Sequence, residues 1–106
     1  MTKISIEDTL PILLGCEDHL FTIYDYARKA YTAPFLASTL EQAKRFCVDQ
    51  IKTSPTSYFA LYPNSFSLCH IGVFDHSAGK VKDSGRVDIG TFAQIQRDVE
   101  DSAKNA

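Results

Sequence analysis

Cys69 and His70 are adjacent in the sequence, and a cysteine beside a histidine can in principle act as a nucleophile with its general base. Both residues fall in an apolar run that predicts a strand, where neighbouring side chains point to opposite faces of the sheet. They therefore cannot easily share one site, and we interpret Cys69 as a core thiol. Asp75, His76 and Ser77 contain the residue types of a catalytic triad, but successive residues of a turn cannot build triad geometry. The sequence therefore predicts a turn there, and no enzyme.

Histidine and cysteine side chains are potential metal ligands, but their spacing here resembles neither a zinc knuckle nor a helical histidine pair. Gly72 is isolated in the predicted strand, where close backbone approach or packing explains it, and no glycine-rich phosphate-binding motif is present. We therefore expect neither a metal nor another cofactor. The three cysteines, Cys16, Cys47 and Cys69, are an odd number without paired spacing, which disfavours a disulfide scaffold.

Aromatic and basic residues could together bind single-stranded nucleic acid, because aromatic rings stack on bases and cations neutralise phosphates. The aromatic residues are Tyr24, Tyr26, Tyr31, Tyr58, Phe59 and Tyr62, and the basic residues near them in the sequence are Arg28, Lys29, Lys44 and Arg45. The alternative places these aromatic residues in the core and at strand rims, and residue types alone favour it.

Charge is spread unevenly along the chain. The net charge is −2 overall, divided into −4 over residues 1–25, +4 over residues 26–97 and −2 over residues 98–106. A mildly basic centre between acidic ends is compatible with a nucleic-acid surface, although such surfaces usually carry a stronger excess. Glu7, Asp8 and the short apolar run after Pro11 predict neither a secretory signal nor a membrane span, so we expect a cytosolic protein.

The predicted sheet is organised around two apolar strands, Tyr58–Tyr62 and Ser67–Phe74. No Asp, Glu, Lys or Arg occurs from Thr53 to Phe74, and an uncharged strand at a sheet edge would invite aggregation, so we expect this pair at the sheet centre. The β-branched and aromatic run Leu20–Tyr26 predicts a first strand. Arg28–Pro34 is then expected to form a loop. Val81 and residues 85–89 could add a further strand.

Two amphipathic helices are expected to flank these strands. Ser38 with Glu41, or Thr39 with Gln42, begins a main helix over residues 39–52. Its apolar stripe, flanked by Phe46 and Val48, consists of Leu40, Ala43, Cys47 and Ile51. Thr91 with Gln94 begins a second helix that reaches about Asp101 and presents Phe92, Ile95 and Val99 at helical spacing.

These elements predict an α+β fold, in which a small antiparallel sheet packs against one main helix and a second helix lies at the C-terminus. We expect one domain of 106 residues, with an N-terminal arm or short helix over residues 1–19, a core over residues 20–90 and the C-terminal helix and tail over residues 91–106. Both faces of the central strands are apolar. The main helix can cover only one of these faces, and we expect the other to be covered by the C-terminal helix or by a second copy of the chain.

Two segments resemble a known family. The first is DYARKAYTAPF, with Asp25, Ala27, Ala30, Tyr31, Pro34 and Phe35, followed by Ala43 and Arg45 in the main helix. The second is PNSFSLCHIGVFDHSAG over residues 63–79, where Ile-Gly-x-Phe-Asp precedes a glycine turn. Together they resemble the small nonstructural protein of gokushovirus-type microviruses, which are small single-stranded DNA phages.

The resemblance implies a non-virion phage protein that acts in the cytoplasm of the bacterial host, in single-stranded DNA synthesis or in the transfer of that DNA to packaging. Direct DNA contact would then fall to Arg28, Lys29, Lys44 and Arg45, with Tyr26 and Tyr31 as stacking partners. One alternative is an adaptor that binds phage or host replication proteins through the charge-free region from Thr53 to Phe74, without touching DNA. The other is an enzyme of a type that the sequence does not reveal.

Overall fold

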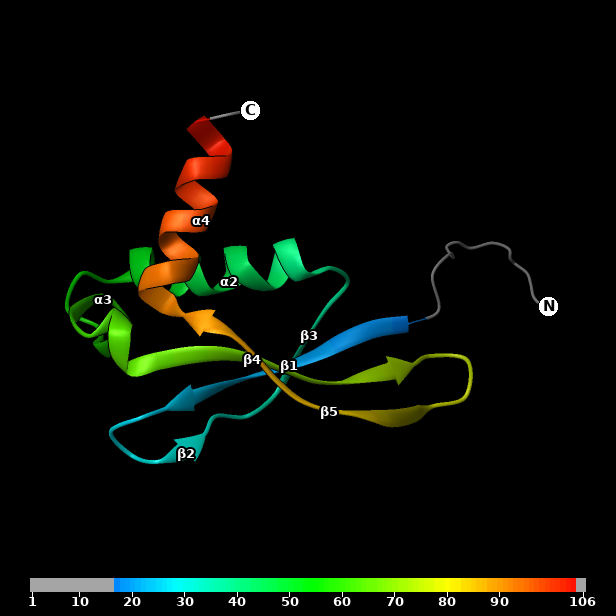
Figure 1. Ribbon diagram of the computed structural model, residues 1–106. Helices are drawn as coiled ribbons and strands as arrows, with labels where there is room; N and C mark the ends of the chain where they lie inside the picture. The colour runs from blue at the N-terminus through cyan, green and yellow to red at the C-terminus, as the bar shows by residue number, and fades with distance from the viewer. Residues whose placement is uncertain (1–16, 105–106) are drawn as a thin grey trace.

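A computed structural model describes the backbone of residues 17–104 and the side chains of residues 17–101 (Figure 1). This part of the chain forms one curled antiparallel sheet with its helices on one side, which confirms the predicted α+β class. In chain order the elements are β1 (Glu17–Asp25), β2 (Ala30–Tyr31), β3 (Phe35–Ala37), α2 (Leu40–Thr53), α3 (Tyr58–Leu61), the 3-10 turn η1 (Pro63–Ser65), β4 (Phe66–Asp75), β5 (Lys80–Thr91) and α4 (Phe92–Lys104). The arm or helix predicted over residues 1–19 lies outside the described residues as far as residue 16, and residues 17–19 begin β1.

Strand β4 lies at the centre of the sheet, whose order is β2-β1-β4-β5, with β3 also paired to β1. This confirms the predicted strand Ser67–Phe74 and its central position. β1 confirms the predicted first strand, with its start moved back to Glu17. β5 confirms the strand predicted around Val81 and extends it to 12 residues, because pairing with β4 supplies backbone hydrogen bonds even where the side-chain alternation is weak.

Two glycines fix the geometry of the β4–β5 hairpin. A Cβ atom at Gly72 would lie 2.6 Å from the backbone oxygen of Lys82, so close approach of the neighbouring strand requires a glycine there, as predicted. Gly79 has φ +65° and its N–H donates to the carbonyl of Asp75 over 2.8 Å, which closes the predicted turn. The side chain of Asp75 also accepts backbone hydrogen bonds within this turn, so it has a structural partner.

Threonine side chains begin both long helices. Thr39 accepts a hydrogen bond from the N–H of Gln42 over 3.1 Å, and Thr91 accepts one from the N–H of Gln94 over 3.2 Å. Each bond satisfies a backbone donor that the first turn of a helix leaves unpaired. Of the two predicted start signals of α2, the pair Thr39 and Gln42 is therefore the one used. Helix α4 continues beyond the predicted end, to Lys104.

The hydrophobic core lies between the sheet and the two long helices. Helix α2 buries Ala43, Cys47 and Val48 and packs Ile51 at the margin, whereas Leu40 at its first turn stays exposed. The other buried core residues are Phe21, Ile23, Phe66, Leu68, Phe92 and Ile95. At about 25 cal/mol per Å² of apolar surface, burial of these side chains is the main source of stability.

The predicted strand Tyr58–Tyr62 is wrong, because these residues form the single helical turn α3. The hydroxyl of Ser57 accepts a hydrogen bond from the N–H of Ala60 over 3.2 Å, and Pro63 begins η1 directly after the turn. The turn sends Phe59 towards the core, where its ring centroid lies 4.7 Å from that of Phe66. A five-residue aromatic run is too short for alternation alone to separate a strand from a helical turn.

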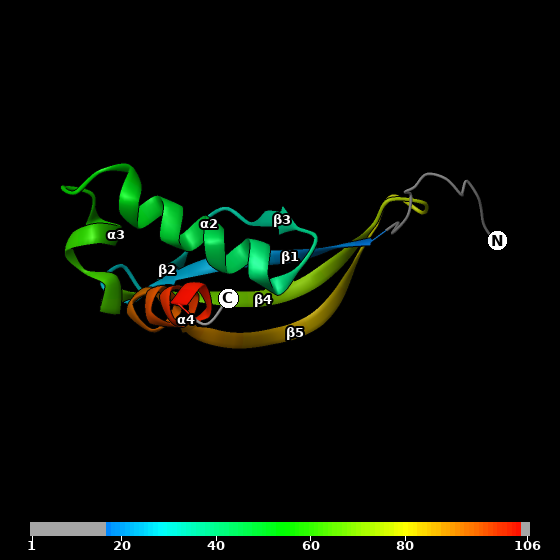
Figure 2. The same ribbon diagram turned by 90° about the horizontal axis from the view of Figure 1, so that it is seen from above.

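Of the two predicted covers for the second face of the sheet, the C-terminal helix is wrong, while a second copy of the chain stays a prediction. Helices α2 and α4 pack against each other and against the same core (Figure 1). In Figure 2 helix α2 lies over the sheet, while the tip of the β4–β5 hairpin extends past the start of α2. The opposite face of the sheet is therefore not covered by any element of the described chain.

The segment Arg28–Pro34, predicted as a loop, contains the two-residue strand β2. Tyr31 pairs with Tyr24 and Ala30 pairs with Asp25. The side chain of Asp25 accepts hydrogen bonds from the N–H groups of Ala27 and Arg28, which forms the tight turn. This β1–β2 hairpin brings tyrosines from two strands together.

Candidate nucleic-acid interface

The uncovered side of the sheet, here called the open face, is defined by the strand register. Residues directly opposite each other in paired strands point to the same side of a sheet. Thr22 lies opposite Cys69, and Cys69 lies opposite Asp88, so these three side chains are on one side. Their sequence neighbours Phe21 and Leu68 point into the core on the other side. The open face thus runs across β1, β4 and β5.

Three tyrosines, here called the tyrosine cluster, gather at one end of the open face. The ring centroid of Tyr24 lies 5.0 Å from that of Tyr26 and 4.7 Å from that of Tyr31. Tyr26 is 46% exposed and Tyr31 is 47% exposed. The hydroxyl of Tyr26 lies 3.0 Å from that of Ser67 in β4, which holds the Tyr26 ring against the sheet. The cluster therefore offers aromatic surface to solvent in a fixed arrangement.

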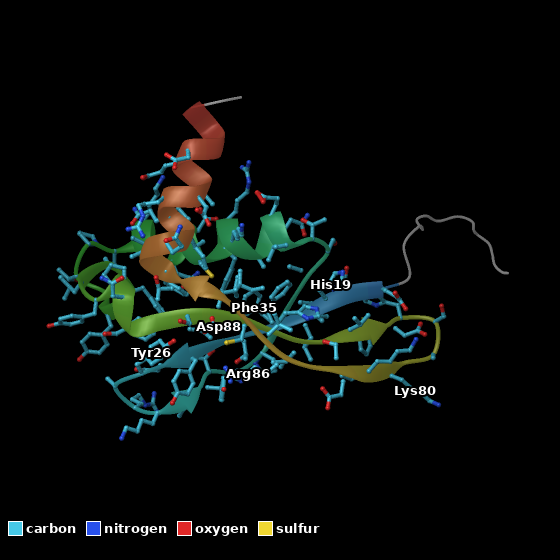
Figure 3. The ribbon with its side chains drawn as sticks, in the orientation of Figure 1. His19, Tyr26, Phe35, Lys80, Arg86 and Asp88 are labelled. Carbon is cyan, nitrogen blue, oxygen red and sulfur yellow. The ribbon has the colours of Figure 1, made fainter. Side chains whose placement is uncertain are left out.

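Two cations flank the tyrosine cluster. Lys29 lies in the β1–β2 turn with φ 56°, a left-handed conformation that lysine seldom adopts. Arg86 comes from β5, at the opposite edge of the sheet. Figure 3 shows Arg86 and Tyr26 on the side of the sheet away from α2 and α4, whereas Phe35 lies on the side of α2. Basic and aromatic side chains from distant parts of the sequence therefore meet on one surface.

The open face is hollowed between these side chains. One shallow cavity of about 510 Å³ is lined by Tyr24, Tyr26, Lys29, Tyr31, Ser67, Cys69, Arg86 and Asp88. A second cavity of about 360 Å³ is lined by Thr22, Tyr31, Thr32, Pro34, Ile71 and Arg86. Tyr31 and Arg86 line both cavities, so the two cavities lie next to each other on the open face.

Arg86 keeps its charge over the whole physiological pH range. The neighbouring Tyr31 hydroxyl, and then the Cys69 thiol, raise the pKa of Arg86 further above its ordinary value. The described chain contains no carboxylate within ion-pair distance of Arg86, although Asp88 is two residues away on the same strand. The guanidinium is therefore free to pair with an external anion such as a phosphate.

The structure brings together only part of the predicted DNA-binding set. Tyr26, Tyr31 and Lys29 lie side by side on the open face, and Arg28 points to a neighbouring groove. Lys44 and Arg45 lie on α2, which packs on the core face of the sheet. They are therefore on the other side of the molecule from the open face. Lys44 also approaches Asp98 of α4, with 4.0 Å between Nζ and Oδ2.

Two members of this surface, Tyr24 and Arg86, are absent from the predicted binding residues. Tyr24 belongs to the aromatic set noted in the sequence, and its alternation with Ile23 in β1 places it opposite the core face. Arg86 could have been found only by extending β5 and pairing it with β4, since Cys69 lies beside Asp88 in that register. The missing signal is therefore strand pairing and not residue type.

The described cysteine and histidine side chains are buried or hydrogen-bonded to other side chains. Burial raises the pKa of Cys47 to about 12, so that thiol is uncharged and a poor nucleophile at neutral pH. Cys69 is buried in the sheet, and His70 points to the opposite face, as predicted. Nδ1 of His19 lies 3.1 Å from Nε2 of His70, and burial, followed by the nearby His19, lowers the pKa of His70. Among the described residues no group of three or more His, Cys, Asp or Glu could hold a metal ion.

A hydrogen bond between side chains joins the start of β1 to the β4–β5 turn. Nε2 of His76 lies 2.9 Å from Oδ2 of Asp18, and the hydroxyl of Ser38 donates to the other oxygen of the same carboxylate over 3.1 Å. The hydrogen bond from His76 is the largest cause of the lowered pKa of Asp18. These three residues connect the start of β1 to the start of α2 and to the β4–β5 turn, and they lie away from the tyrosine cluster.

The fold and this surface define a class of protein: a small α+β domain whose sheet is covered by helices on one side and presents clustered tyrosines and cations on the other. The model of the phage ORF5 protein family matches residues 18–95, which run from β1 into α4 and include the whole open face. The chain therefore belongs to the phage ORF5 protein family. Comparison with curated proteins and with solved structures found no significant similarity. No helix in the described part of the chain is long and apolar enough to cross a membrane.

Proposed function

We propose that this protein is a non-enzymatic accessory protein of a gokushovirus-type phage and that it binds single-stranded viral DNA on the open face of its sheet. It acts in the host cytoplasm, during synthesis of that DNA or its transfer to packaging. Membership of a phage family and the resemblance to the small nonstructural protein of these phages support the biological setting. The observation that carries the proposal is the tyrosine cluster between Lys29 and Arg86.

Single-stranded DNA suits this surface better than a duplex. Bases of a single strand can leave their stack and lie on an aromatic ring, at about 1–3 kcal/mol per base, whereas bases inside a duplex are already stacked. Every base has a π-face, so stacking on tyrosine tolerates any sequence. Lys29 and Arg86 lie on opposite sides of the tyrosine cluster, where they can pair with the phosphates that flank the stacked bases.

The number of cations sets the expected salt dependence. Each phosphate contact contributes about 0.7 to the slope of log K against log salt for a single strand. Two or three contacts therefore predict a shallow slope, of about −1.4 to −2.1. The net charge of −2 further disfavours tight, purely electrostatic binding. Affinity should depend on the tyrosine rings as well as on charge.

Fluorescence anisotropy with a labelled oligothymidylate, measured over a range of salt concentrations, tests the proposal. Tyr31→Ala and Arg86→Ala should each weaken binding by about five- to tenfold, and Arg86→Ala should also flatten the salt slope by about 0.7. Arg45→Ala is the matched control, because it removes a cation from the opposite layer. If Arg45→Ala weakens binding as much as Arg86→Ala does, the DNA does not lie on the open face.

A protein–protein adaptor is the second candidate. It is favoured by the exposure of Tyr58, Leu61 and Tyr62, apolar or aromatic residues of the charge-free region that the sheet does not cover. In that case the protein meets phage or host replication proteins and does not touch DNA. The same titration distinguishes the two, since an adaptor shows no DNA binding even at low salt, where electrostatic contacts are strongest.

A further inference from the structure

A second hollow, here called the hairpin groove, lies next to the open face. It has a volume of about 730 Å³ and separates the β1–β2 hairpin from α3 and η1. Ala27 and Arg28 line it from the hairpin, and Tyr58, Phe59 and Tyr62 line it from the other side. Figures 1 and 2 both place α3 at the same end of the molecule as this hairpin. The groove is not part of the surface described above.

Two exposed tyrosine rings stand next to each other at the groove. The centroids of Tyr58 and Tyr62 are 6.3 Å apart with an interplanar angle of 35°, and these side chains are 72% and 57% exposed. A flat ring inserted between two others needs a centroid spacing of about 7 Å, because carbon atoms in contact lie about 3.5 Å apart. The pair would therefore admit one planar base if the rings turned parallel and moved apart to that spacing.

The groove around this ring pair is supported by the hydrophobic core on one wall and carries a cation on the other. Phe59 fills the groove floor, and its ring lies 4.7 Å from that of Phe66 and 5.2 Å from that of Phe92 in the core. Arg28 stands on the opposite wall, where the hydrogen bond from its N–H to the Asp25 side chain over 3.2 Å fixes the turn. No ion pair within 4.0 Å engages the Arg28 guanidinium in the described chain.

The hairpin groove and the open face share a wall. Tyr26 donates its backbone N–H to the carbonyl of Ser65 on the groove side over 2.9 Å, while its hydroxyl bonds to Ser67 on the open face. Along the same turn Arg28 faces the groove and Lys29 faces the open face. A strand lying on the tyrosine cluster thus needs to pass only this one turn to enter the groove.

We infer that the hairpin groove is a second base-binding site for the same DNA strand. One base inserts between Tyr58 and Tyr62, and a phosphate pairs with Arg28 as the strand passes around the β1–β2 turn. This inference rests on the proposed function. Two mostly exposed rings across the groove from a cation without an ion-pair partner fit a nucleotide, which is planar at one end and anionic at the other, better than they fit an apolar peptide side chain.

Oligothymidylates of about four and about twelve nucleotides separate the two sites, because only the longer one can reach from the tyrosine cluster into the groove. Tyr58→Ala combined with Tyr62→Ala should weaken binding of the longer strand by about tenfold and leave the shorter strand unchanged. The matched control, Tyr58→Phe combined with Tyr62→Phe, keeps the rings and should bind both strands like the wild type. Both residues are exposed, so circular dichroism should show a retained fold.

The outcomes separate the two claims. If the wild type binds neither strand, the proposed function fails. If the wild type binds the longer strand and the double alanine variant binds it equally well, the proposed function stands but the inference is overturned, and the groove is left to a protein partner. Equal weakening of both strands, or loss of binding in the phenylalanine control, also overturns it, because neither result follows from a base held between rings.

Discussion

Replacing Lys29 by glycine separates the charge of the β1–β2 turn from its backbone conformation. Lys29 has φ 56°, and a left-handed conformation costs a residue with a side chain roughly 1 kcal/mol. Glycine adopts it without strain, but its greater freedom in the unfolded chain offsets about 0.5–1 kcal/mol of that gain. The Lys29→Gly variant should therefore be as stable as the wild type or slightly more stable, with a midpoint of thermal unfolding raised by no more than about 4 °C.

The same substitution should weaken DNA binding. Loss of one phosphate contact lowers the salt slope by about 0.7, which at about 0.05 M salt corresponds to about 0.9 in log K, or roughly eightfold in affinity. The difference should shrink as salt is added, because screening removes the contribution of the lost contact. Anisotropy titrations at two salt concentrations, together with thermal melts of the same samples, measure both effects.

Two further variants make this experiment decisive. Lys29→Asn also tolerates the left-handed conformation and lacks the charge, so it should lose as much affinity as Lys29→Gly. Lys29→Arg keeps both the strain and the charge and should bind like the wild type. Weaker binding in Lys29→Gly but not in Lys29→Asn would refute the reasoning, since turn flexibility and not the cation would then be responsible.

Two other predictions concern the fold. Gly72→Ala should lower the free energy of unfolding in urea by about 2–3 kcal/mol, because the new Cβ would meet the backbone oxygen of Lys82 at 2.6 Å. Gly79→Ala has open space around its Cβ and should cost only about 1 kcal/mol, for its positive φ. Equal losses in the two variants would contradict this. Acidification from neutral pH should also destabilise the protein, since the lowered pKa of His70 means that the unfolded chain binds a proton in a range where the folded chain does not. The stability that depends on uncharged His70 is fully present above the ordinary histidine pKa. It is lost as the pH falls through the pKa of His70 in the folded protein, at no more than about 1.4 kcal/mol per pH unit. His70→Gln should reduce the slope of stability against pH, and an unchanged slope would contradict this assignment.

Local signals in the sequence suffice for the long helices and the central strand. Thr39 and Thr91 accept hydrogen bonds from residues three positions further on, so the start of each helix depends only on neighbours that can be read from the sequence. The apolar alternation of β4 persists over enough residues to predict a strand. The run from Tyr58 to Tyr62 is different, because its pattern fits either structure and the choice depends on where Phe59 finds partners. Those partners, Phe66 and Phe92, come from later parts of the chain.

The candidate site depends on contacts between residues still further apart in the sequence, so residue types alone could not show which side chains lie on one surface. Tyr24 and Tyr31 meet because a tight turn pairs β1 with β2, and Arg86 joins them because β4 lies between β1 and β5. A shift of one residue in any of these pairings would turn a tyrosine or the arginine towards the other face of the sheet. Lys44 is not part of this surface, because the apolar stripe of α2 packs on the core side of the sheet. The candidate surface is thus a property of the strand register. If it binds DNA as proposed, changes that move the register should abolish binding even where every aromatic and basic side chain is kept.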